Sequence, residues 1–154
     1  MKESFIKLFN RDIEKLKNEI SSYKSEESLW KISGETRLPG GQVKNSGGNL
    51  CLHLCGNLQH FIGAVLGNSG YERNRDAEFS RKNVPVEELL KEIDETKKVV
   101  DSALNSLNND ILQKVYPINV FGEEMTTEFF IIHLLAHLNY HLGQINYHRR
   151  LLDN

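Results

Sequence analysis

The residues best suited to chemistry in this sequence are its histidines, which are confined to two stretches of the chain. The six are His53, His60, His133, His137, His141 and His148. In an α-helix, residues four apart differ by about 40° in direction and about 6 Å along the axis. Two imidazoles in that relation can bind one divalent ion, and histidine is the commonest metal ligand. The stretch HLLAHLNYHLGQ, residues 133–144, therefore predicts a metal-binding helix face.

Spacing alone leaves the chelating pair open. His133 and His141 would lie about 12 Å apart along a helix, too far to share an ion easily. The pair is therefore His133/His137 or His137/His141, and a third ligand has to come from another element. His53 is the leading candidate because it borders the apolar arc of its helix, whereas His60 lies about 10 Å further along. Surface histidines, or core histidines satisfied by hydrogen bonds, are the alternative interpretation.

Four segments with a helical hydrophobic repeat must position these histidines. Apolar residues recur at spacings of three and four near residues 2–24, 46–66, 86–108 and 126–152. The stretch between the first two segments is rich in glycine. Residues 71–83 are predicted to form a charged linker that can include a short turn of helix. Residues 113–121 are predicted to form a short extended segment. The pattern predicts one all-α domain over residues 1–154, a four-helix bundle whose long connections allow crossovers.

Composition narrows the classes of function. The chain has 154 residues, which is the size of one domain. Its formal net charge of −2 gives no overall positive potential that would attract nucleic acid. No apolar run approaches the ~18 residues of a membrane span, and the charged N-terminus lacks a signal-peptide core. We therefore expect a cytoplasmic protein. Cys51 and Cys55 are expected to be reduced, and on a helix they point about 160° away from His53.

Two motifs resemble the signature segments of the DinB/YfiT-like superfamily. They are LHLCGNL at residues 52–58 and HLNYHLGQI at residues 137–145. Members of that superfamily are four-helix metalloproteins, in which one histidine on the second helix and a late HxxxH before a GQ pair form a metal triad. The resemblance therefore implies that His53, His137 and His141 bind one divalent metal ion.

The resemblance extends to the charged connection. The segment RNRDAEF, residues 73–79, is similar to one uncharacterised branch of the superfamily. Its Arg73, Asp76 and Glu78 either reach the mouth of the site or form a structural ion pair. Many relatives carry arginine where this chain has Leu142, so a substrate contact made by that arginine is not carried over.

Residues next to the proposed ligands have local roles. Asn57 lies one turn after the histidine of the second helix, and Gln144 lies close to His141. Either amide can orient an imidazole that binds a metal, with a hydrogen bond between helices as the alternative. Gly56 and Gly143 are expected to allow close packing of helices, because a glycine inside a helix costs stability unless packing requires it.

Three histidine ligands leave coordination positions open, which is the form of a catalytic site. Characterised members of the superfamily include transferases and isomerases that use low-molecular-weight thiols such as bacillithiol or mycothiol. The resemblance thus implies a metal-dependent thiol transferase acting on an electrophilic substrate, without assigning catalytic residues. The alternatives are a metal-dependent hydrolase and a non-catalytic metal-binding or stress-response protein. The metal is zinc, nickel, iron or manganese, all of which accept imidazole.

Homodimers are common among relatives, which predicts a homodimer here as well. Apolar residues such as Phe121, Phe129 and Phe130 exceed what one bundle is expected to bury. Exposed apolar residues are also common on monomers, so the residues themselves leave the oligomeric state open.

Overall fold

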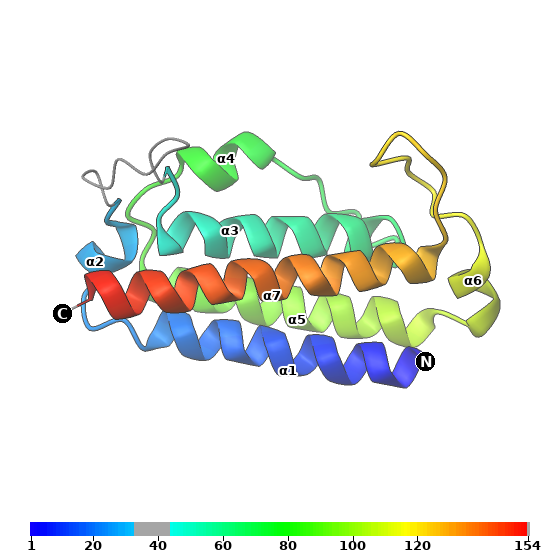
Figure 1. Cartoon of the computed structure of the whole chain (residues 1–154), viewed down its shortest axis with the longest axis horizontal. Helices are drawn as coiled ribbons and strands as arrows, with labels where there is room; N and C mark the ends of the chain where they lie inside the picture. The colour runs from blue at the N-terminus through cyan, green and yellow to red at the C-terminus, as the bar shows by residue number, and fades with distance from the viewer. Residues whose placement is uncertain (33–43, 154) are drawn as a thin grey trace.

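Long apolar faces drive the fold, which is a bundle of four long helices (Figure 1). The computed structural model describes residues 1–32 and 44–153. The long helices are α1 (Lys2–Ser21), α3 (Gly47–Leu58), α5 (Val86–Ser106) and α7 (Thr127–Leu152). The shorter ones are α2 (Glu26–Trp30), the π-helix η1 (Gln59–Ala64), α4 (Arg75–Ser80) and α6 (Asn109–Gln113). Within the described residues there is no sheet, only an isolated bridge between Val115 and Thr126.

The all-α prediction is confirmed, and three predicted helices agree closely with α1, α5 and α7. Local capping explains where two of the helices begin. The Ser46 side chain accepts a hydrogen bond from the Asn49 backbone at the start of α3, and Thr126 accepts one from Phe129 at the start of α7. The charged connection contains a short helix, α4, as the sequence allowed. The glycine-rich stretch lies largely outside the described residues.

The second predicted helix corresponds to α3 together with η1, and its last turns are a π-helix, which the sequence did not indicate. The Val65 backbone N–H donates to His60 O, five residues back, whereas the Leu66 N–H donates to Ile62 O. Because of this change of register, the Phe61 carbonyl is skipped by the helix and accepts a hydrogen bond from the Tyr116 hydroxyl instead, at 2.7 Å. The wide turn is therefore held by a side chain that is distant in sequence.

The topology is not a simple up-and-down arrangement. α1 and α3 each pack against both α5 and α7. In Figure 1, α3 and α5 run in one direction along the bundle, and α1 and α7 run in the other. Residues 65–85 must therefore return along the length of the bundle, and they carry α4 across the outer side of α3. This crossover places a charged helix beside a buried one.

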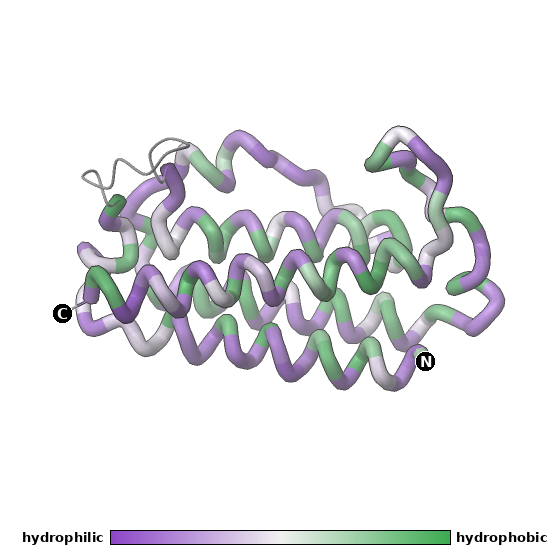
Figure 2. Tube along the Cα trace, in the orientation of Figure 1, coloured by the Kyte–Doolittle hydropathy of each residue, from purple (hydrophilic) through white to green (hydrophobic). Residues whose placement is uncertain are grey.

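The core is continuous along the bundle. Apolar residues alternate with hydrophilic ones along α1 and α5 (Figure 2), which matches one buried and one solvated face. α3 differs, because all twelve of its residues are buried. Its polar side chains therefore need internal partners. Among the described residues, no helix is long and apolar enough to cross a membrane.

Candidate metal centre

Packing of α3 against α7 brings His53, His137 and His141 together. The Nε2 atoms of His53 and His137 are 3.2 Å apart, and those of His137 and His141 are 3.1 Å apart. Each residue offers one ligand atom, and these atoms all lie within 4.8 Å of one another. The spacing of four within α7 thus supplies two donors on one face, and the facing helix supplies the third.

Hydrogen bonds fix the ring protons of two of these histidines. His53 Nδ1 lies 2.9 Å from Glu78 Oε2, and His141 Nδ1 lies 2.6 Å from Gln144 Oε1. A carboxylate and an amide oxygen only accept, so both Nδ1 atoms carry the proton and donate it. The Nε2 atoms of His53 and His141 are consequently left as lone pairs aimed at the centre of the cluster.

These residues fit a bound cation. The lone pairs of His53 and His141 both face His137 Nε2, which can carry at most one proton in the neutral ring. One lone pair is therefore left without a donor. His137 Nδ1 is also buried and has no hydrogen-bond partner among the described residues. A divalent ion held by the three Nε2 atoms would satisfy every converging lone pair, which protons alone do not.

Burial keeps the imidazoles in the form that binds metals. Burial, together with the neighbouring His141 and His53 rings, which disfavour a further positive charge, lowers the pKa of His137 to about 4. Burial also lowers the pKa of His141, although the hydrogen bond to Gln144 opposes it. Neutral imidazole is the ligand that metals require, so protons compete weakly for this site near pH 7.

An ion pair behind His53 holds its ring in place. Arg73 donates two hydrogen bonds to the Glu78 carboxylate, from Nε to Oε1 at 2.7 Å and from Nη2 to Oε2 at 2.9 Å. Burial raises the pKa of the Glu78 carboxyl, but hydrogen bonds from His53 and Arg73 outweigh burial and leave it below its usual value. Glu78 is therefore an anion that orients the His53 ring and would strengthen its Nε2 atom as a donor to a metal ion.

Gly56 makes room for this carboxylate. It lies on α3 one turn from His53, and a Cβ atom built on it would overlap the Glu78 carboxyl group. The sequence indicated that Gly56 allows close packing of helices, and the side chain that packs against it is Glu78 of α4. For Glu78 the sequence left open an ion pair or a place at the site, and the structure shows both, in contact with Arg73 and His53.

The other histidines lie outside the cluster. His133 stacks with Phe130 and meets Phe121 edge to face, and its ring centroid is 6.2 Å from that of His137. His60 packs edge to face on the adjacent Phe61. His148 lies 2.7 Å from the Tyr23 hydroxyl and 2.8 Å from the Lys31 carbonyl, so it has a structural role.

Two further sequence expectations have definite outcomes. Gln144 accepts a hydrogen bond from His141 Nδ1, whereas the partner of His53 Nδ1 is Glu78 rather than Asn57. Asn57 is buried and its Oδ1 has no hydrogen-bond partner among the described residues. Cys51 and Cys55 are free and buried in α3.

Comparison with known proteins identifies structures with a similar fold and the family to which this chain belongs. The structure is similar to a crystal structure of a DinB-like protein from Bacillus cereus ATCC 10987, with a TM-score of 0.72 and 17% sequence identity. The match covers 97% of this chain and 91% of that one, and it confirms the resemblance at the level of the fold. No curated protein matches. The model of a family described as a protein of unknown function, DUF1572, matches residues 4–154. The chain therefore belongs to the DUF1572 family and has a DinB-like fold.

Proposed function

We propose that this protein binds one divalent metal ion through His53, His137 and His141 and is a metal-dependent transferase that uses a low-molecular-weight thiol. The observation that carries the proposal is the convergence of three Nε2 atoms with no carboxylate among them. Three protein ligands leave positions open for an exogenous ligand, as in catalytic rather than structural metal sites.

The charge balance of the site favours an anionic ligand. Imidazole binds a metal as a neutral ligand, and the charge of Glu78 is matched by Arg73 in the ion pair behind His53. Hence no protein ligand neutralises the charge of a bound dication. When bound, the metal supplies Lewis acidity that lowers the pKa of a thiol at an open position. An anionic sulfur ligand would neutralise one of the two positive charges that the protein ligands leave unbalanced.

The proposed reaction is a nucleophilic substitution. The thiol loses its proton to solvent, its sulfur forms a bond to an electrophilic carbon, and the bond from that carbon to the leaving group breaks. The role of the protein in this reaction is to hold the three histidine rings in position. Glu78 fixes the ring of His53, and Gln144 fixes the ring of His141. We place the reaction in the cytoplasm, where small thiols are kept reduced.

Metal content of single variants tests the site itself. We expect about one equivalent of zinc, nickel, iron or manganese per chain after loading, and loss of most of it in His53→Ala, His137→Ala and His141→Ala. His133→Ala and His60→Ala are matched controls, since both remove a nearby imidazole outside the cluster. Elemental analysis after identical loading is the measurement. Retention of metal by His141→Ala together with its loss from His133→Ala would contradict the assigned ligands.

A conjugation assay tests the activity separately. The metal-loaded protein is given bacillithiol, glutathione or cysteine with a bimane electrophile, and formation of the thioether is followed by fluorescence. We expect turnover by the wild type and by His133→Ala, and none by His141→Ala. An ester substrate is assayed in parallel. Full metal content with ester hydrolysis and no thioether would support the hydrolase instead, and metal content with neither product would leave a binding protein.

A further inference from the structure

Two aromatic side chains, Phe79 and Tyr140, lie against imidazoles of the histidine cluster and are called here the outer rings. The Phe79 ring is 5.1 Å from the His53 ring, centroid to centroid, with 35° between their planes. The Tyr140 ring is 5.1 Å from the His141 ring and meets it nearly edge to face, at 73°. Such separations are typical of interacting aromatic pairs. Neither outer ring belongs to the hydrophobic core.

Both outer rings are accessible to solvent. Successive residues of a helix differ by about 100° in direction, so Tyr140 points out of the bundle beside His141, and its side chain is 65% exposed. Phe79 follows Glu78 on α4 and is partly exposed. The His53 and His141 rings are themselves 5.2 Å apart. The two outer rings, which come from different elements, therefore flank one small region of surface at the histidine cluster.

The connection before α7 adds apolar groups on the same side of the molecule. Its segment PINVFG, residues 117–122, carries no charge. The exposed apolar members are Ile118, Val120 and Phe121. The Phe121 ring lies 4.7 Å from the ring of His133, one helical turn before the cluster. In Figure 1, α4 and this connection both lie on the outer side of α3. Exposed apolar groups gathered in one place mark a binding surface.

The charged side chains beside this surface already have partners. Glu78 and Arg73 neutralise each other in their ion pair. The Arg75 guanidinium lies over the Phe79 ring, 5.4 Å from its centroid, and this cation–π contact steadies the ring. The surface at the histidine cluster therefore presents ring faces and ring edges to a substrate, as ligand sites lined by aromatic side chains do.

We propose that Phe79 and Tyr140 make the site specific for an electrophile whose reacting carbon is attached to an aromatic ring. This inference rests on the proposed transferase function and names its substrate class. A planar ring between the outer rings can stack on Phe79 and meet Tyr140 edge to face, and each such contact strengthens binding by roughly two- to tenfold. An open-chain electrophile makes neither contact. The thiol sulfur then forms its bond to the carbon on the ring, and the leaving group departs with its electron pair.

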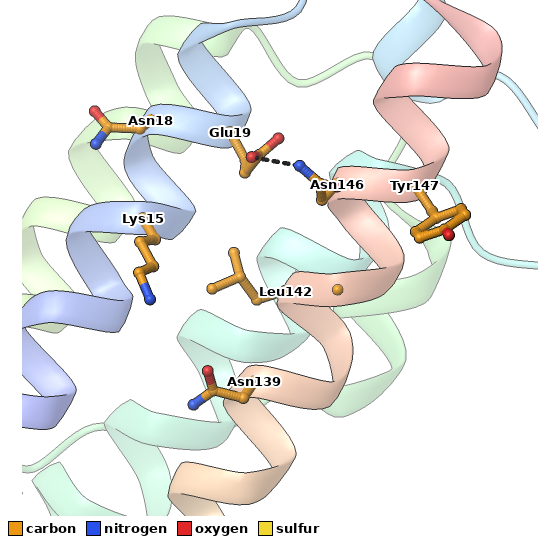
Figure 3. A pocket seen from close by; sticks show the side chains of 8 residues that line it. Lys15, Asn18, Glu19, Asn139, Leu142, Asn146 and Tyr147 are labelled. Atoms are coloured by element: carbon orange, nitrogen blue, oxygen red, sulfur yellow. Dashed lines mark hydrogen bonds between the residues drawn. The ribbon is translucent and has the colours of Figure 1, made fainter.

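The groove between α1 and α7 provides a contrasting surface (Figure 3). It has a volume of about 410 Å³, and the charged Lys15 and Glu19 line it together with three asparagines. Tyr147 lines the same groove and is 64% exposed, almost the same as Tyr140. Its ring lies 5.9 Å from the Arg150 guanidinium rather than against an imidazole of the cluster. Tyr147 is therefore a matched control, an equally exposed tyrosine on the same helix.

Fluorine NMR tests the binding surface without any reaction. Para-fluorobenzyl alcohol, which has a ring, and fluoroethanol, which has none, are titrated against the protein before and after zinc loading. The wild type and Tyr147→Leu should bind the ring probe equally and more tightly than fluoroethanol. Tyr140→Leu and Phe79→Leu should each bind it roughly two- to tenfold more weakly. A wild type that does not bind the ring probe, or equal binding by Tyr140→Leu and Tyr147→Leu, overturns the proposal.

Two chlorides test the specificity in the reaction itself. Benzyl chloride and allyl chloride have the same leaving group, and the first has a ring. With bacillithiol and the zinc-loaded wild type, kcat/KM corrected for the uncatalysed reaction should be roughly tenfold higher for benzyl chloride. Tyr140→Leu should lower this ratio and Tyr147→Leu should not. An unchanged ratio in Tyr140→Leu overturns the proposal. Turnover of neither chloride contradicts the transferase function, and the titration of the ring probe then still decides whether the aromatic site exists.

Discussion

The three imidazoles of the cluster differ in how firmly their rings are held. His53 donates to a carboxylate, His141 donates to a neutral amide, and His137 Nδ1 has no partner among the described residues. A carboxylate partner both orients a ligand imidazole and raises its basicity. His53, from the facing helix, is therefore the imidazole of the three that is best preorganised to bind a metal.

Gly56 controls that preorganisation, which gives the first prediction. Gly56→Ala should displace the Glu78 carboxylate, because the new methyl group takes its place. We expect zinc affinity to fall by roughly 10- to 100-fold, the usual effect of losing such a partner. Titration against a chelating dye measures it. Gly143→Ala is the matched control, since its methyl group meets nothing within 4 Å, and it should bind zinc as the wild type does. Unchanged affinity in Gly56→Ala would show that Glu78 is not needed.

The sequence predicted the clustered histidines better than it predicted the residues that contact them. Residues four apart on a helix share a face whatever the tertiary fold, so spacing limits the pair to His133/His137 or His137/His141. The family resemblance selected His137 and His141, and these are the two that lie with His53 in the structure. The contact of Glu78 with His53 joins two elements separated by a crossover. The local sequence of the charged connection does not determine where α4 packs. The signal was present only as the segment RNRDAEF, whose arginine and glutamate form the ion pair.

At the scale of elements, a single amide ties α4 to the start of α3. The Asn49 side-chain amide donates to the carbonyls of Glu78, Phe79 and Arg81, at 3.0 to 3.2 Å. These carbonyls belong to the last turn of α4 and its end, which have no partners within the helix. Asn49 therefore holds in place the element that carries Glu78.

Removing this tether gives the second prediction. Asn49→Ala should lower the free energy of unfolding by about 2 kcal/mol, since it leaves buried carbonyls without donors. It should also speed hydrogen exchange in α4 and weaken zinc binding. Asn108→Ala is the control, because it removes a cap from the distant α6. That change should cost about 1 kcal/mol and leave exchange in α4 unchanged. Equal exchange in α4 for both variants would contradict the role of Asn49.

The lengths of the elements were predictable, but the π-helix was not. Apolar repeats and capping residues are local, and they marked the ends of the long helices closely. The change of register in η1 depends on Tyr116, more than fifty residues away, whose hydroxyl takes the Phe61 carbonyl. Gly63 adds a second distant cause, because a Cβ atom there would meet the Val99 side chain of α5. The pattern of hydrophobic residues in the sequence predicts neither of these two contacts.

At the scale of the whole molecule, buried polar groups join helices that are distant in sequence. Asp12 of α1 has a fully buried side chain and accepts hydrogen bonds from Arg11 on its own helix and from Asn139 on α7. Lys15 lies 3.2 Å from the same carboxylate. This cluster crosses the seam between α1 and α7, which run parallel and are the first and last helices of the bundle.

This seam gives the last prediction, which concerns pH. Burial alone would raise the pKa of Asp12, but hydrogen bonds from Arg11, Asn139 and Lys15 lower it from 3.8 to about 2. The folded state thus holds this proton less tightly than the unfolded chain does. The stabilisation, about 2 kcal/mol, is complete well above pH 3.8 and is lost as the pH falls towards 2.

Asp12→Asn should therefore unfold more easily than the wild type at pH 7, with a difference in urea unfolding free energy that shrinks between pH 5 and pH 2.5. Glu14→Gln is the control, because Glu14 pairs with Lys97 at the surface and should contribute little at any pH. An unfolding difference for Asp12→Asn that stays constant over this range would show that the carboxylate acts through packing. A shrinking difference would show that its charge joins α1 to α7.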